Sequence, residues 1–194
     1  YLMIITGISI SLALQISGIT GLVLAFLLSQ LQMLWDCCDG EIARWRETQS
    51  PKGVFLDRVG HYLTESFIPI ALAYRVGNEN YELLFLAALV SVFILLNKGF
   101  NDSVHVARAY SQLPKIADSK DVGAPKSTFL KVARAPFKLF AVQRLFHSVE
   151  MSILILIFSA SENLIRIGLP VAVFVTVGHL ISILGSRKLD SGTR

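Results

Sequence analysis

Long apolar segments dominate this chain and limit the folds that it can adopt. They cover roughly residues 1–15, 18–43, 54–75, 80–98, 137–160 and 163–186. A membrane-spanning helix needs about 20 mainly apolar residues, and a chain that is 53% hydrophobic and only 16% charged is too apolar for an ordinary soluble domain. We therefore expect an all-α fold, a polytopic membrane bundle of about six transmembrane helices.

The domain organisation is expected to be simple. The 194 residues contain no long Ser/Pro-rich linker and no detectable repeat, so residues 1–194 are expected to form one membrane domain. The first apolar segment is short and begins with Tyr1 rather than Met. It is therefore interpreted as the remainder of a longer helix, with upstream residues missing, and not as a cleaved signal peptide.

Basic residues cluster on one side of the expected bundle. Of the 18 Lys and Arg residues, only Arg75 and Arg166 fall on the other side. Because positive charges concentrate in cytoplasmic loops, we expect an integral protein of the cell (inner) membrane whose acidic segment faces the cytoplasm. The net charge of +4 is then explained by topology and by attraction to anionic lipid head groups, so no nucleic-acid partner is expected.

Carboxylates and a histidine stand at the ends of two neighbouring apolar segments. Asp36 and Asp39 share one face of the helix expected at 18–43. Asp57, His61 and Glu65 follow i, i+4 steps on the next. Hard oxygen ligands suit Mg²⁺, Mn²⁺ or Ca²⁺, with phosphate completing the coordination. The pattern predicts a metal-bound phosphate, although an Asp-x-x-Asp pair taken alone also fits a solvated charged turn.

A longer signature distinguishes these two interpretations. Its matching positions in this chain are Asp36, Asp39, Gly40, Ala43, Arg44, Gly53 and Asp57. Together they resemble the pattern Asp-x-x-Asp-Gly-x-x-Ala-Arg, about eight residues, Gly-x-x-x-Asp-x-x-x-Asp of the CDP-alcohol phosphotransferase family, with seven of eight fixed positions present. The resemblance implies a membrane transferase that moves a phospho-alcohol group from a CDP-linked alcohol to an acceptor hydroxyl and releases CMP, in the synthesis of phospholipids or related polyol phosphates.

The resemblance also implies roles for individual residues. Carboxylates matching Asp36, Asp39 and Asp57 hold one or two divalent cations, Mg²⁺ or Mn²⁺, against the pyrophosphate of the donor. The nucleotide-binding residues that it implies are Asp36, Gly40, Ala43, Arg44, Gly53 and Asp57. Small residues at positions 40, 43 and 53 would also let a bulky ligand approach the backbone. Relatives of this kind further imply a possible homodimer.

His61 is the departure from the signature, because the family has a fourth Asp there. That Asp is read as the base that deprotonates the acceptor and as a ligand of a second metal. A neutral imidazole can accept a proton, and Glu65, one turn further on, can orient the ring. We expect His61 to act as base or metal ligand, supported by Glu65. The alternatives are a mechanism that uses Glu65 or the acceptor's own phosphate, and a catalytically weakened relative that binds nucleotide or lipid.

The sequence says less about the acceptor-binding residues and about the polar run that follows the fourth apolar segment. Arg108, Arg134 and Arg144 are expected to hold an anionic acceptor, although basic residues near an interface also extend to lipid head groups. The polar run at 97–108 either faces the site or is a solvated helix extension. The acceptor can be a polyol, a polyol phosphate or a lipid, and the donor CDP-diacylglycerol or a soluble CDP-alcohol. Cys37 and Cys38 are adjacent and are expected to pack without forming a disulfide.

Overall fold

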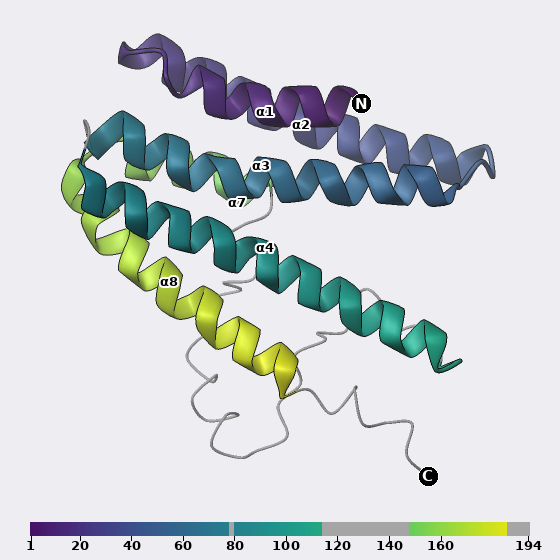
Figure 1. Ribbon diagram of the computed structural model, residues 1–194. Helices are drawn as coiled ribbons and strands as arrows, with labels where there is room; N and C mark the ends of the chain where they lie inside the picture. Colours follow the sequence, from purple (N-terminus) through teal and green to yellow (C-terminus); the bar gives the residue numbers. More distant parts are fainter. Residues whose placement is uncertain (78–79, 114–147, 186–194) are drawn as a thin grey trace.

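The computed structural model describes residues 1–77, 80–113 and 148–185, and these residues form an all-α bundle (Figure 1). Its helices are α1 (Leu2–Ala13), α2 (Gly18–Trp45), α3 (Pro51–Gly77), α4 (Tyr81–Tyr110), α7 (Ser148–Phe158) and α8 (Glu162–Leu184). Within the described residues there is no strand. The expected fold class is confirmed.

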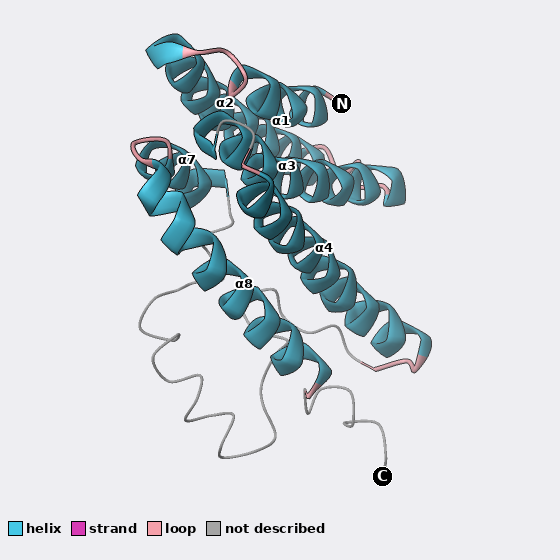
Figure 2. Ribbon diagram, turned by 60° about the vertical axis from the view of Figure 1, so that its left-hand side comes forward, coloured by secondary structure: helices cyan, strands magenta, loops and turns pink. Residues whose placement is uncertain are grey.

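Each helix packs against its neighbours along the length of the bundle. Helix α1 contacts α2 and α3, α3 contacts α4, α4 contacts α8, and α7 packs against α2. The α1–α2 turn lies at one end of the bundle, together with the C-terminus of α3 and the N-termini of α4 and α8 (Figure 1). The α2–α3 turn lies at the other end. From another side, α4 and α8 are seen to slant together across the bundle (Figure 2).

Three of the helices are long and apolar enough to cross a membrane by length and composition, namely α2, α4 and α8. Helix α3 has 27 residues but carries polar side chains along its first half. The segment expected at 1–15 forms a helix of only 12 residues, about 18 Å long and shorter than the hydrocarbon core. Of the segment expected at 137–160, the described part begins at Ser148.

Helix α4 is longer than its hydropathy indicates. The expected segment ends at residue 98, whereas the helix continues to Tyr110. It ends where Gln112 adopts a left-handed conformation with φ 53°. The amide of Leu113 then donates to the carbonyl of Arg108 at 2.9 Å, which is a common helix C-terminal motif. The residues of the polar run that follow position 98 therefore continue the helix of α4.

A short turn brings the ends of α2 and α3 together. Glu47 takes the left-handed position, with φ 53°, and the amide of Thr48 donates to the carbonyl of Ala43 at 3.0 Å. Helix α3 then starts at once, because Pro51 occupies its first position and the hydroxyl of Ser50 accepts a hydrogen bond from the amide of Gly53 at 3.1 Å. The C-terminal turns of α2 thus lie beside the first turns of α3.

Arg75 fastens the opposite end of the bundle. Its guanidinium donates to the carbonyl oxygens of Leu14 at 2.8 Å, Ile16 at 2.5 Å and Gly18 at 2.6 Å. These carbonyls belong to the α1–α2 turn, which has few backbone partners of its own. Arg75, which the sequence marks only as an exception to the charge bias, therefore ties α3 to α1 and α2.

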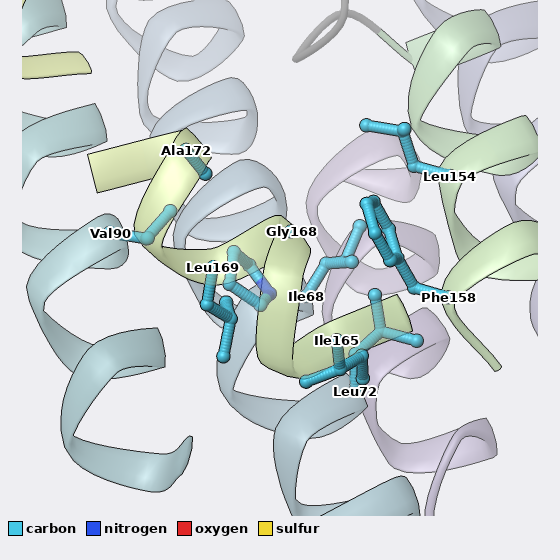
Figure 3. A pocket seen from close by; sticks show the side chains of 10 residues that line it. Ile68, Leu72, Val90, Leu154, Phe158, Ile165, Gly168, Leu169 and Ala172 are labelled. Carbon is cyan, nitrogen blue, oxygen red and sulfur yellow. The ribbon is translucent and has the colours of Figure 1, made fainter. Parts of the chain in front are cut away.

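A hollow lined by apolar side chains lies in the same half of the bundle as Arg75. It is formed between α3, α4, α7 and α8, and Figure 3 shows Ile68, Leu72, Phe158 and Leu169 among the side chains around it. The residues that line it carry no charged group. The expected metal ligands Asp36, Asp57 and His61 lie in the other half, toward the α2–α3 turn.

Candidate metal and phosphate site

Asp36, Asp57 and His61 meet between α2 and α3. The Nε2 atom of His61 lies 3.4 Å from Oδ1 of Asp36 and 3.8 Å from Oδ1 of Asp57. One ligand atom from each of the three residues lies within 4.8 Å of the other two. Among the described residues, this is the group of acidic and histidine side chains that could hold a metal ion.

Helix geometry explains why these three side chains converge. Asp57 and His61 are four residues apart and occupy one face of α3. Asp36 lies in the last third of α2, and the short α2–α3 turn brings its side chain toward that face, 3.4 Å from Nε2 of His61. The site is therefore formed by two consecutive helices.

The donor set fits a divalent cation that also binds phosphate. Ligand atoms about 2.1 Å from one octahedral cation are about 3 Å apart or more, and separations of 3.4 and 3.8 Å suit this arrangement. Two carboxylates suit Mg²⁺ or Mn²⁺, whereas the imidazole nitrogen is a softer donor. The side chains of Asp36 and Asp57 are 30% and 46% exposed, so a ligand can reach them.

Asp39, the remaining expected metal ligand, is not in this group. It lies three residues beyond Asp36 on α2 and is exposed. The structure therefore brings three of the four expected metal ligands together, and the role of Asp39 stays a prediction.

The expected nucleotide-binding residues surround the α2–α3 turn. Arg44 is in the last turn of α2, where its 59% exposed side chain pairs with Glu41 at 2.6 Å. A Cβ atom added to Gly40 would meet only the flexible end of Arg44, at 3.4 Å, and one added to Gly53 would meet only the Ser50 hydroxyl, at 3.4 Å. Neither glycine is required by close packing in this fold.

His61 has a buried acidic neighbour on its other face. The Nδ1 atom of His61 is buried and forms no hydrogen bond within the described part of the chain. Oε1 of Glu65 lies 3.5 Å away. Glu65 is itself only 3% exposed, and it accepts a hydrogen bond of 2.9 Å from Nζ of Lys98 on α4. A row of polar groups thus runs from the Asp pair through His61 and Glu65 to Lys98.

The first part of the polar run at 97–108 contacts α3. Besides the Lys98 contact, Asp102 pairs with Arg58 and accepts a hydrogen bond from the Tyr62 hydroxyl. The sequence analysis includes Lys98 and Asp102 in this run but names no partner for either residue. The available signal was a charged residue at the end of an apolar helix, which is costly unless it has a partner.

The expected acceptor-binding arginines are only partly described. Arg108 lies in the last turn of α4, about 15 Å along the helix from Lys98 at the standard rise per residue. Arg134 and Arg144 lie outside the described residues. The acceptor site therefore stays a prediction.

Comparison with known proteins agrees with the geometry. The family model for CDP-alcohol phosphatidyltransferase matches residues 1–177. No curated protein and no solved structure matches the chain. The family match covers the helices that form the site, including the α2–α3 turn and most of α8. This all-α chain belongs to the CDP-alcohol phosphatidyltransferase family.

Proposed function

We propose that this membrane protein is a divalent-metal-dependent enzyme that releases CMP from a CDP-linked alcohol and transfers the phospho-alcohol group to a hydroxyl acceptor. Family membership supports the transfer of a phospho-alcohol group. The observation that carries the metal dependence is the convergence of Asp36, Asp57 and His61 at three positions of the family signature.

Asp36 and Asp57 are proposed to hold the cation, Mg²⁺ or Mn²⁺, against the donor pyrophosphate. A cation bound there would neutralise charge on the phosphate oxygens and stabilise the departing CMP. Asp39, one turn further along α2, is proposed as an additional ligand when the donor is present. Its exposure leaves it accessible to a second cation or to one shared with the phosphates.

The CDP group is proposed to bind beside the turn, against Gly40, Ala43, Arg44 and Gly53. The open space around both glycines supports this, because the protein alone does not need glycine at either position. Arg44 supplies a charged donor for a phosphate oxygen or the base. Its partner Glu41 is exposed, so a ligand can compete for the guanidinium.

His61 is proposed as the base that takes the proton of the acceptor hydroxyl, or as the third metal ligand. Both roles use Nε2, because that atom faces Asp36 and Asp57 while Nδ1 is buried beside Glu65. The active site is proposed to face the cytoplasm, with Arg108, Arg134 and Arg144 holding an anionic acceptor. A homodimer is part of the same proposal.

The test is metal-dependent CMP release by the purified protein. CDP-diacylglycerol and soluble CDP-alcohols are each supplied with polyol, polyol phosphate and lipid acceptors, in Mg²⁺, Mn²⁺ or EDTA. We expect CMP from one donor class only, abolished by EDTA and by Asp57→Asn. Equal binding of CDP, ADP and UDP compounds would remove the cytidine assignment. Nucleotide binding without turnover for any pair would favour the alternative of a weakened, nucleotide-binding relative.

A further inference from the structure

Lys98 and Glu65 form a shielded ion pair between α4 and α3. Their charged atoms are 2.9 Å apart, and the side chains are 22% and 4% exposed. A carboxylate buried to this degree is strongly destabilised unless a cation or several hydrogen bonds compensate it. In the described residues, Lys98 is the residue that donates a hydrogen bond to Glu65. Lys98 therefore holds this carboxylate in position.

The position of Lys98 is itself restrained. Its Nζ atom lies 5.8 Å from the centroid of the Tyr62 ring, within the range of a cation–π contact. Tyr62 also bonds to Asp102 on α4. The ammonium group is therefore held between the Tyr62 ring and the Glu65 carboxylate, at one place along α3.

The Glu65 carboxylate faces the ring nitrogen of His61 that points away from the Asp pair. Nδ1 is buried without a hydrogen bond in the described residues, and Oε1 of Glu65, at 3.5 Å, needs only a small shift to accept from it. A carboxylate on one ring nitrogen fixes the proton there and leaves the other nitrogen to the metal or the substrate.

We propose that Lys98 is a positioning residue for the His61 ring: through Glu65 it keeps a proton on Nδ1 and directs Nε2 to Asp36 and Asp57. This inference rests on the proposed function for its kinetic consequences, although the placement of the ring proton does not require turnover. Lys98 touches neither metal nor substrate in this scheme. Its effect passes entirely through Glu65.

The experiment compares five proteins: wild type, Lys98→Met, Lys98→Arg, Glu65→Gln and the double variant Glu65→Gln/Lys98→Met. Removal of Lys98 should lower kcat for CMP release about 10- to 100-fold, the usual effect of losing a partner behind a functional histidine. KM for the CDP-linked donor should change little, and Lys98→Arg should restore most of kcat. Because Lys98 acts through Glu65, the double variant should match Glu65→Gln alone.

A second measurement reads the ring directly. The protein contains four histidines, so ¹⁵N-histidine NMR with Mg²⁺ present can resolve His61, identified by loss of its signals in His61→Ala. We expect one tautomer, with the proton on Nδ1, in wild type and Lys98→Arg, and a tautomer mixture in Lys98→Met, Glu65→Gln and the double variant. The double variant removes both buried charges together, so it keeps the test available if Lys98→Met does not fold.

Tyr62→Phe is the matched control, because it breaks a neighbouring α3–α4 hydrogen bond while the ring remains under Lys98. It should leave the tautomer and kcat unchanged. The proposal is overturned by a folded Lys98→Met with wild-type kcat or by a double variant far slower than Glu65→Gln. It is also overturned if Lys98→Met and the double variant keep the wild-type tautomer. An inactive wild type would contradict the transferase function, and the NMR result would still decide the link from Lys98 to His61.

Discussion

Nε2 of His61 on α3 lies 3.4 Å from Oδ1 of Asp36 on α2. This contact joins the residue that the sequence analysis expects to depart from the family signature to the first carboxylate that it expects to bind a metal. Among the described residues, His61 therefore belongs to the same group as the two carboxylates Asp36 and Asp57.

The three aspartates should differ in their effect on metal binding. Asp36→Asn and Asp57→Asn should weaken Mn²⁺ binding on the order of tenfold or more, because each removes a charged ligand from the converging group. Asp39→Asn should have a smaller effect without donor, since Asp39 is exposed and outside that group. Electron paramagnetic resonance of free Mn²⁺ measures all three, and an equal loss for Asp39→Asn would place it among the primary ligands.

Alanine should have different effects at the glycines beside the α2–α3 turn and at Gly7 of α1. Gly40→Ala and Gly53→Ala should leave thermal stability nearly unchanged and weaken binding of CDP-linked donors, because only the ligand needs the space there. In Gly7→Ala the new Cβ would lie 1.9 Å from the Thr64 hydroxyl, an overlap that should cost about 1–3 kcal/mol. Thermal unfolding in detergent and donor titration separate the two effects; normal donor binding by both site variants would reject the proposed nucleotide position.

Arg75 should contribute to stability without contributing to the reaction. Arg75→Met leaves three carbonyl groups of the α1–α2 turn without their donor. We expect the free energy of unfolding to fall by about 1–3 kcal/mol, the usual range for a hydrogen bond to a charged group, and toward the lower end because the site is partly exposed. Arg166→Met is the control, because in the described residues the side chain of Arg166 bonds the exposed carboxylate of Glu162, one turn earlier on its own helix. A fall in kcat in folded Arg75→Met would contradict this separation.

The sequence predicts the long apolar helices more accurately than it predicts the polar contacts between helices. Apolar runs locate α2, α4 and α8 because a membrane selects for length and hydropathy. Spacing along one helix places Asp57, His61 and Glu65 on one face. The pairing of Lys98 with Glu65 depends on how α3 and α4 cross, which hydropathy does not encode. Hydropathy also ends the fourth apolar segment at residue 98, although the helix continues to Tyr110 with polar side chains.

Orientation in the membrane can be tested from the charge bias. A single cysteine at Glu47, in the α2–α3 turn, should be protected from an impermeant reagent in intact cells, and one at Glu162, at the start of α8, should be labelled. The background must lack Cys37 and Cys38, because Cys37 is exposed. Labelling at Glu47 and protection at Glu162 would invert the proposed orientation.

His61 distinguishes a working variant of the family site from a weakened one. If Nε2 takes the acceptor proton, His61→Ala should lower kcat by two orders of magnitude or more, within the range known for general bases, while donor binding changes little. His61→Asp should keep activity, because a carboxylate restores the signature. CMP release and Mn²⁺ affinity are measured on the same preparations.

Loss of Mn²⁺ affinity together with kcat in His61→Ala would assign Nε2 to the metal. An inactive wild type that His61→Asp activates would identify the natural protein as a weakened relative, and unchanged turnover in His61→Ala would show that the base lies elsewhere.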